Sequence, residues 1–127
     1  MSLTDRGAQI CLRALRGEVL SAQNFYLSLH LGQPSVGSNE VGSGGYARVQ
    51  IPSGSWSVSG RVQTSTSAII FPTPTEDWGT PLWAGVYDSV TGGNLIWESK
   101  LPSNVSPVKS GDPVSIGVGS LTMSIGV

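Results

Sequence analysis

Residues 71–97 read FPTPTEDWGTPLWAGVYDSVTGGNLIW, and this stretch decides the fold. Three of the four tryptophans of the chain lie in it, at Trp78, Trp83 and Trp97. Aromatic and β-branched residues favour strands, whereas Gly, Pro, Asn and Asp favour turns. The order of these residues predicts a loop at 72–81 followed by a β-hairpin at 82–99. No catalytic set accompanies the hairpin, so the stretch indicates a structural or binding module.

Alternating apolar and polar runs on both sides of the hairpin predict further short strands. Including the hairpin, we expect strands at 24–31, 46–51, 56–62, 67–71, 82–88, 94–99, 114–118 and 121–127. Gly119 and Ser120 shift the phase between the last two runs, which predicts a tight turn or a bulge. About seven to eight short strands separated by regular turn signals favour an all-β fold, an antiparallel β-sandwich or barrel.

The one helix is expected at about 4–16, ahead of the strands. Thr4 is suited to cap its first turn, and Gly17 to take the left-handed position after its last turn. Ala8, Cys11, Leu12 and Leu15 form an apolar stripe at helical spacing. Cys11 is the only cysteine, and we expect it to pack within this stripe. The stripe must cover another surface, either the sheets of the same chain or a neighbouring molecule.

Composition favours one domain, residues 1–127, that forms contacts with other molecules. Seven Lys and Arg against eight Asp and Glu give a net charge of -1, without the basic patch expected of a nucleic-acid or membrane partner. Charged residues make up only 12% of the chain, which is low for a solitary soluble domain. With no signal peptide or membrane-spanning run, we expect synthesis in the cytosol and then assembly.

The sequence offers no catalytic, cofactor-binding or metal-binding set. His30, the only histidine, falls on the polar face of its predicted strand, where we expect an ordinary surface or interface residue. Glu76 and Asp77 are adjacent carboxylates, and Asp77 before Trp78 suits a turn better than a metal site.

Aromatic residues offer a choice between packing and ligand binding. Trp83 and Tyr87 share one strand face, and Trp97 on the partner strand is expected to lie across from them. Core or subunit-interface packing is favoured over a sugar-stacking platform. Trp78 lies alone in the loop and is the tryptophan expected to touch a partner.

Several short motifs, taken in order, resemble a known group of proteins. They are GGYAR at 44–48, Phe71-Pro72 with Trp78-Gly79, AGVYD at 84–88, TGGNL at 91–95 and SGD at 110–112. This order is similar to that of small tailed-bacteriophage virion proteins commonly labelled phage tail fibre proteins. The similarity extends over most of the chain, from the opening helix to the C-terminal strands. Pro81-Leu82-Trp83 and the residues after Met123 depart from the common pattern.

The resemblance implies a non-enzymatic component of the phage particle, in the neck or collar, the tail fibre or the head surface. We expect a homo-oligomer that contacts other virion proteins. Arg48 is either a bidentate partner for a carboxylate or a surface residue in a weak ion pair. The candidate partner-binding residues are Trp78, Asp77, Glu76, Arg48, Tyr46 and Trp83. The alternative is a carbohydrate-binding module for a host glycan that uses surface tryptophans, and a hydrolase is the least favoured class.

Overall fold

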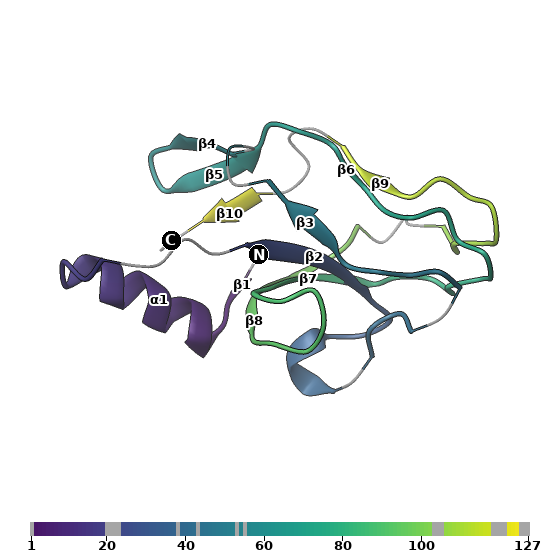
Figure 1. Cartoon of the computed structure of the whole chain (residues 1–127), viewed down its shortest axis with the longest axis horizontal. Helices are drawn as coiled ribbons and strands as arrows, with labels where there is room; N and C mark the ends of the chain where they lie inside the picture. The colour runs from purple at the N-terminus through teal and green to yellow at the C-terminus, as the bar shows by residue number, and fades with distance from the viewer. Residues whose placement is uncertain are drawn as a thin grey trace.

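The computed structural model describes residues 2–19, 24–37, 39–42, 44–52, 54, 56–102, 106–117 and 122–124. Most of the regular structure in this part is β-strand, preceded by one α-helix, α1 (Asp5–Leu15) (Figure 1). The strands are β1 (Ser2–Leu3), β2 (Phe25–His30), β3 (Val49–Ile51), β4 (Trp56–Ser59), β5 (Val62–Ser65), β6 (Ile69–Ile70), β7 (Trp83–Tyr87), β8 (Leu95–Lys100), β9 (Ser115–Ile116) and β10 (Thr122–Ser124). A short 3₁₀ helix, η1 (Pro34–Val36), lies between β2 and β3. All strand pairs are antiparallel, as the sequence predicts.

The predicted hairpin is the centre of the largest sheet. This sheet has five strands in the order β1-β8-β7-β2-β3, so β7 has a neighbour on each side. The chain turns between β7 and β8 through Gly92 and Gly93, whose φ angles are +59° and +72°. Asp88 holds the turn, because its Oδ1 accepts a hydrogen bond of 2.7 Å from the backbone N–H of Asn94. Glycine at positive φ matches what a tight hairpin turn requires.

The expected position of Trp97 opposite Trp83 and Tyr87 is wrong. Trp97 pairs with Val86, and Tyr87 pairs with Leu95 across a register shift. Successive side chains of a strand point to opposite faces, so Trp97 shares the face of Val86 and not that of Trp83. That face is the core, where Trp97 is 7% exposed and Val86 is 1% exposed.

Two smaller sheets cover the core face of the five-stranded sheet (Figure 1). One has three strands in the order β10-β5-β4, and the other pairs β6 with β9. The buried residues between these layers include Leu27, Leu29, Ile51, Ile69 and Phe71. The arrangement is an open, sandwich-like fold and not a closed barrel.

Two of the predicted strands differ from the observed ones. The run at 56–62 is part of a hairpin, because Gly60 takes a φ of +59° and turns the chain into β5. The run at 46–51 is a strand only from Val49 onward. Before Val49, the side chains of Tyr46 and Arg48 hydrogen-bond to Glu40, as described below.

His30 is buried, and its expected position on the surface is wrong. Alternation placed it correctly on the face opposite the core, but that face is itself covered. The segment from 31 to 42, which contains η1, folds over it, and His30 is 2% exposed. The alternation identified the face but not the segment that covers it.

Helix α1 begins and ends as the sequence predicts. Thr4 Oγ1 accepts from the N–H of Gly7 at 3.2 Å, and Gly17 has a φ of +80°. The helix packs on β8 at Gly7, which is buried. Only part of the predicted stripe is covered by the described part of the chain: Ala8 and Cys11 are half-buried, whereas Leu12 is 60% and Leu15 is 82% exposed. No helix in the described ranges is long and apolar enough to cross a membrane.

Parts of the two C-terminal predictions lie outside the described residues. Strands β9 and β10 fall within the predicted runs at 114–118 and 121–127. Residues 118–121, with the expected phase shift at Gly119 and Ser120, are not among the described residues, and neither are 125–127.

Gly7→Ala tests how tightly α1 sits on the sheet. A Cβ at this position would lie 2.6 Å from the carbonyl oxygen of Ile96 and 2.5 Å from Leu3 Cδ1. We expect the variant to lose about 1–3 kcal/mol of unfolding free energy in urea denaturation, although alanine raises helix propensity. Gln9→Ala, at an exposed helix position, is the control and should not destabilise the protein. A Gly7→Ala protein more stable than wild type would contradict the close contact.

Candidate interaction site

Arg48 joins three separate segments through one guanidinium. Its Nε donates to Glu40 Oε2 at 2.9 Å and its Nη2 to Glu40 Oε1 at 2.8 Å. Its Nη1 donates to the carbonyl oxygens of Ser89 and Gly92 at 2.9 and 2.8 Å. Its Cζ lies 3.7 Å from the ring centroid of Tyr87. The expected bidentate carboxylate is therefore Glu40 of the same chain, and the alternative of a weak surface pair is wrong because the Arg48 side chain is only 7% exposed.

Tyr46 extends this network into the backbone of the central sheet. Its hydroxyl donates to Glu40 Oε2 at 2.7 Å and accepts from the N–H of Leu29 at 2.9 Å. Burial, together with the hydrogen bond to Glu40, raises the pKa of Tyr46, so the hydroxyl stays protonated. Burial raises the pKa of the Glu40 carboxyl, but hydrogen bonds from Arg48 and Tyr46 outweigh it, and the net pKa lies below its ordinary value. The carboxylate is thus ionised where the network needs an acceptor.

Trp78 is a core residue, and its expected exposure to a partner is wrong. It is 3% exposed, and its ring meets that of Tyr46 edge to face with centroids 5.4 Å apart. Its Nε1 donates to the carbonyl oxygen of Gly44 at 3.0 Å. The loop folds inward because the backbone N–H of Trp78 also donates to the carbonyl of Val108 at 2.9 Å. An isolated loop tryptophan is therefore part of the packing and not of the surface.

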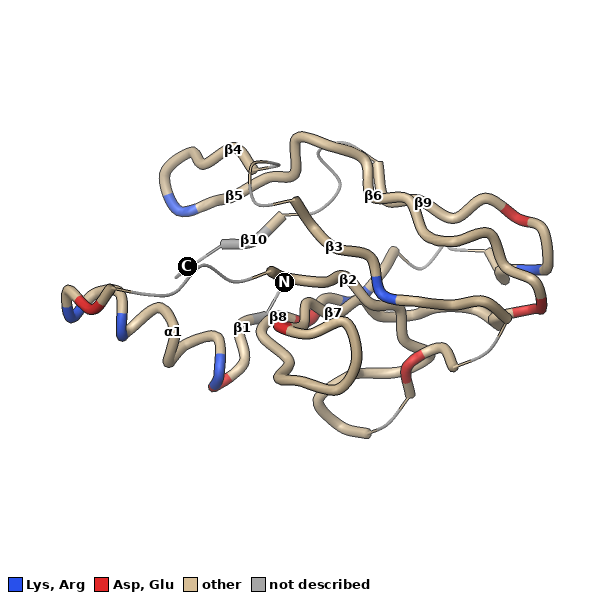
Figure 2. The backbone as a smooth tube through the Cα atoms, in the orientation of Figure 1, with Lys and Arg blue, Asp and Glu red and all other residues tan. Residues whose placement is uncertain are grey.

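Glu76 and Asp77 are exposed, as expected for contact residues. They lie in the loop at the end of the molecule farthest from α1 (Figures 1 and 2). Asp77 Oδ1 accepts from the backbone N–H of Ser110 at 3.0 Å, which joins two loops and is not the local turn contact predicted for it. Among the described residues, no group of three or more His, Cys, Asp or Glu side chains is placed to hold a metal ion.

Trp83 keeps part of its ring accessible on the face opposite the core. It pairs with His30 on β2 and with Lys100 on β8. Leu82 before it is 46% exposed, and Leu31 on the neighbouring chain segment is 45% exposed. Of the six candidate residues, Trp83, Glu76 and Asp77 therefore retain accessible surface, whereas Arg48, Tyr46 and Trp78 serve the interior.

Glu98 is a buried carboxylate that the sequence did not single out. It is 7% exposed, and it accepts hydrogen bonds from Gln33 Nε2 at 2.9 Å, Ser35 Oγ at 2.8 Å and Ser35 N–H at 3.0 Å. Burial raises the pKa of Glu98, but these donors outweigh it and hold the pKa below its ordinary value. The carboxylate fastens η1 to β8, and only its place in an apolar strand run hinted at burial.

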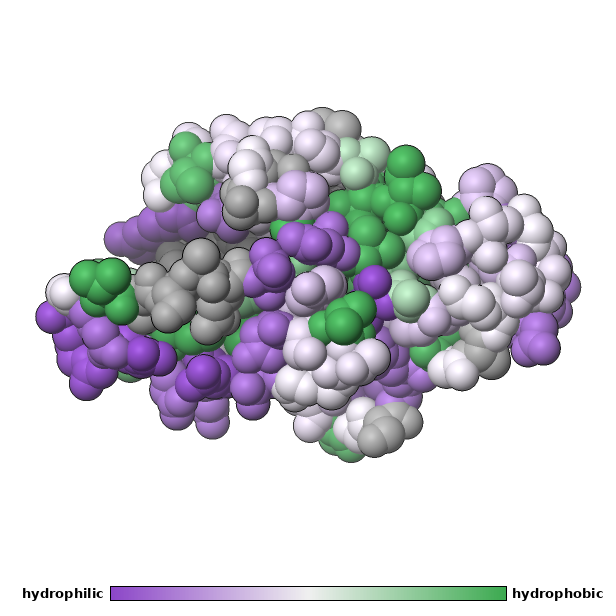
Figure 3. Space-filling view, viewed as in Figure 1, coloured by the Kyte–Doolittle hydropathy of each residue, from purple (hydrophilic) through white to green (hydrophobic). Residues whose placement is uncertain are grey.

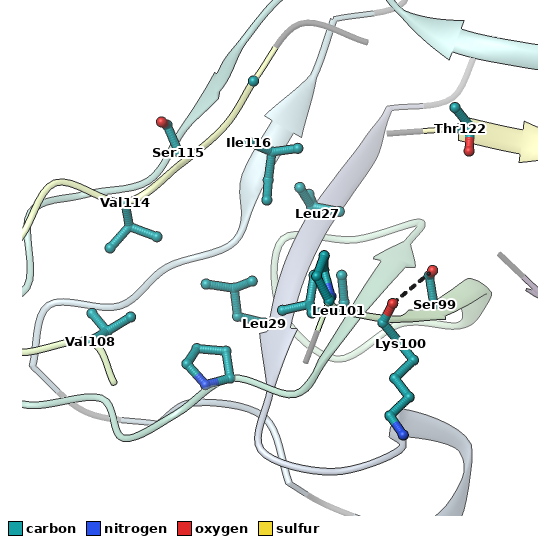
Figure 4. Close-up of a pocket in the computed structure, with 14 residues that line it drawn as sticks. Leu27, Leu29, Ser99, Lys100, Leu101, Val108, Val114, Ser115, Ile116 and Thr122 are labelled. Atoms are coloured by element: carbon teal, nitrogen blue, oxygen red, sulfur yellow. Dashed lines mark hydrogen bonds between the residues drawn. The ribbon is translucent and has the colours of Figure 1, made fainter. Parts of the chain in front are cut away.

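An apolar cavity of about 330 Å³ lies on the core face of the central sheet (Figure 4). Leu27 and Leu29 of β2 form one wall, and Val108, Val114 and Ile116 face them from the covering segments. Cavities lined by such side chains stay dry. Alternation in the run at 114–118 predicted a strand there. The cavity depends on the distance between the two layers, which a sequence pattern does not give.

The chain is similar to a known protein family over nearly its whole length, and not at one residue only. Residues 4–124 match the family model described as podophage GP4 fiber I protein gp80. The match includes α1, all the motifs joined by Arg48 and the described C-terminal strands. No curated protein is significantly similar to the sequence.

Arg48→Lys tests the network directly. Lysine keeps the charge but loses the two-pronged contact with Glu40 and the stacking on Tyr87. We expect a loss of about 2–3 kcal/mol of unfolding free energy by urea denaturation. Arg16→Lys, in the exposed pair with Glu18, is the matched control and should leave stability unchanged. Equal stability of the two variants would contradict a structural role for Arg48.

Acid should destabilise the fold through His30. Burial lowers the pKa of His30, and the charge of Arg48 acts in the same direction, against smaller raising effects of the Asn39 hydrogen bond and the charges of Glu40 and Glu98. The unfolded chain therefore takes up a proton near pH 6.5 that the folded chain takes up only at lower pH. We expect the melting temperature to fall as the pH drops from about 7 to 5, and to fall less in His30→Gln. The same pH dependence in both proteins would contradict this assignment.

Proposed function

From the premise that this chain belongs to the podophage GP4 fiber I protein gp80 family, and is thus a fibre-type structural protein of the phage virion, we propose that it acts without catalysis as an oligomeric subunit. Its task is to hold other virion proteins in place through surface contacts. The neck or collar and the fibre itself are the positions that suit a small subunit with few charges, and a head-surface position is the remaining alternative.

The observation that most supports the proposal is that residues of the motifs named above hold the fold together. Arg48 and Tyr46 face inward and fix loops to the central sheet. His30, the one histidine, is packed between Ser28 Oγ at 2.8 Å and Asn39 Oδ1 at 3.1 Å. Residues that would be candidates for chemistry are thus engaged in holding the fold. A module built this way supplies a rigid shape, which is what an assembly subunit needs.

Contacts with other proteins are proposed for the accessible candidates. Glu76 and Asp77 are exposed on their loop, and Trp83 is half-buried on the face opposite the core, with the preceding Leu82 46% exposed. Large apolar side chains that stay exposed are typical of surfaces buried on assembly. The low share of charged residues, 12%, agrees with a protein that is covered by neighbours.

A host-glycan adhesin is the second candidate function. Only Trp56 and Trp83 retain accessible ring surface among the tryptophans, and such rings stack on sugars. The burial of Trp78 removes the loop tryptophan from this hypothesis. Assembly is therefore preferred over glycan binding.

The test combines virion composition with a surface variant. Mass spectrometry of purified virions should detect the protein at a fixed copy ratio, and light scattering should show the purified chain as an oligomer. Glu76→Lys should reduce incorporation into particles severalfold because it reverses the charge of the contact loop. Gln50→Lys, which places a lysine at an exposed position of β3, is the control and should incorporate normally.

Absence of the protein from washed virions would overturn the proposal. Normal assembly of a Trp83→Ala protein that no longer bound host surface glycan would instead favour the adhesin.

A further inference from the structure

Helix α1 turns two leucines away from its own sheets, whereas its Ile10 packs against the core. Leu12 and Leu15 are 60% and 82% exposed, and the helix lies at one end of the molecule (Figure 1). The space-filling view shows apolar surface at the outer end of the helix (Figure 3). Burying a leucine contributes about 1.5–3 kcal/mol, so two exposed leucines on one short helix favour an occupant for that face.

The contact with β8 cannot use this stripe. The docked position is Gly7, which lies against the Ile96 carbonyl with no room for a side chain. Five residues later, Leu12 lies about 140° around the helix axis from Gly7. The helix cannot bury Leu12 on β8 while Gly7 stays docked.

Charge on the same outer side indicates what covers it. Asp5 and Arg16 are both exposed, and the Arg16 side chain is 70% exposed although it meets Glu18 at 2.8 Å. Eleven residues apart, they lie within about 20° of the same line on the helix and about 16 Å apart. Leu12 lies between them on that side. One helix face thus has an acidic end, an apolar middle and a basic end.

Two copies of this helix face have complementary charges only when the two helices are antiparallel. Two copies of α1 in antiparallel orientation place Asp5 of each beside Arg16 of the other, with leucines between. Parallel copies would place like charges and like helix ends together. A two-fold pairing uses the same patch on both subunits, which is the commonest way for a chain to self-associate.

We propose that two copies of this chain pair through antiparallel α1 helices, with Leu12 and Leu15 buried between them and Asp5 of each copy against Arg16 of the other. The inference rests on the proposed function, because it names the subunit contact of the oligomer. An eleven-residue helix buries less than the roughly 1,200 Å² of a stable interface, so the isolated pair is reversible. Repetition of subunits in an assembly strengthens such contacts.

A thiol placed on the pairing face reports the pairing. Cys11, the only cysteine, lies about 40° around the helix axis from the docked Gly7 and about 100° from Leu12, so it is not on the pairing face. In a Cys11→Ser background, Leu12→Cys should give a disulfide-linked dimer with diamide, which takes two electrons and two protons from a pair of thiols. Cys11→Ser alone should give none. A Leu12→Cys chain that stays uncrosslinked, together with a wild-type chain that sediments as a monomer at the highest soluble concentration, would overturn the proposal.

Charge swapping tests the orientation. Leu12→Glu, at an exposed position, should keep the helical circular dichroism and raise the dissociation constant at least tenfold by sedimentation equilibrium. Asp5→Arg should weaken pairing, and Asp5→Arg with Arg16→Asp should restore it. Unchanged association of Leu12→Glu, or no restoration by the double variant, would overturn the antiparallel pair.

Incorporation into virions distinguishes a failure of helix pairing from a failure of the proposed function. Normal incorporation of a monomeric Leu12→Glu chain would overturn helix pairing as the subunit contact and leave the proposed function in place. Absence of the wild-type protein from virions would overturn the proposed function itself. A monomeric wild-type chain that binds virions through α1 would assign the stripe to another virion protein and overturn the second copy as occupant.

Discussion

The paired Arg48 and Glu40 side chains are the contact on which the rest of the structure depends. Four hydrogen bonds from one guanidinium fasten the segment after β2, the entry to β3 and the turn of the central hairpin. Glu40 also holds Tyr46, which reaches the backbone of β2 and packs on Trp78. Partial burial makes this network costly to break, because a charge left without its partner would stay away from water.

This contact explains why weak motifs recur in a fixed order. GGYAR supplies Tyr46 and Arg48, AGVYD supplies the ring below the guanidinium, and TGGNL supplies the carbonyl of Gly92. Each motif alone is ordinary turn or strand sequence. Together they are the pieces of one network, which no single piece can form. The order along the chain therefore indicates a shared structure more strongly than it indicates a shared reaction.

Local patterns predicted what depends on neighbours in sequence. The cap at Thr4, the stop at Gly17 and the hairpin at 82–99 follow from periodicity and turn chemistry, and the structure has all three. Burial of Trp78 and His30 depends on loops that return from distant segments, so alternation and loop position could not give it. The hairpin register that pairs Trp97 with Val86, on the core face, is likewise set by packing between strands and not by a local pattern.

The network of Arg48, Glu40 and Tyr46 connects parts of the same chain and leaves the outer surface available for contacts with other proteins. Because the loops are held by their own polar partners, they do not need a neighbour to become ordered, and the shape is set before assembly. Helix α1 shows the same separation. Gly7 packs closely against the sheet, whereas Leu12 and Leu15 are exposed on the outside. Because Gly7 takes the closest contact with β8, Leu12 and Leu15 remain accessible to another molecule. For a fibre-type subunit, that division separates the residues that build the fold from the residues proposed to join copies.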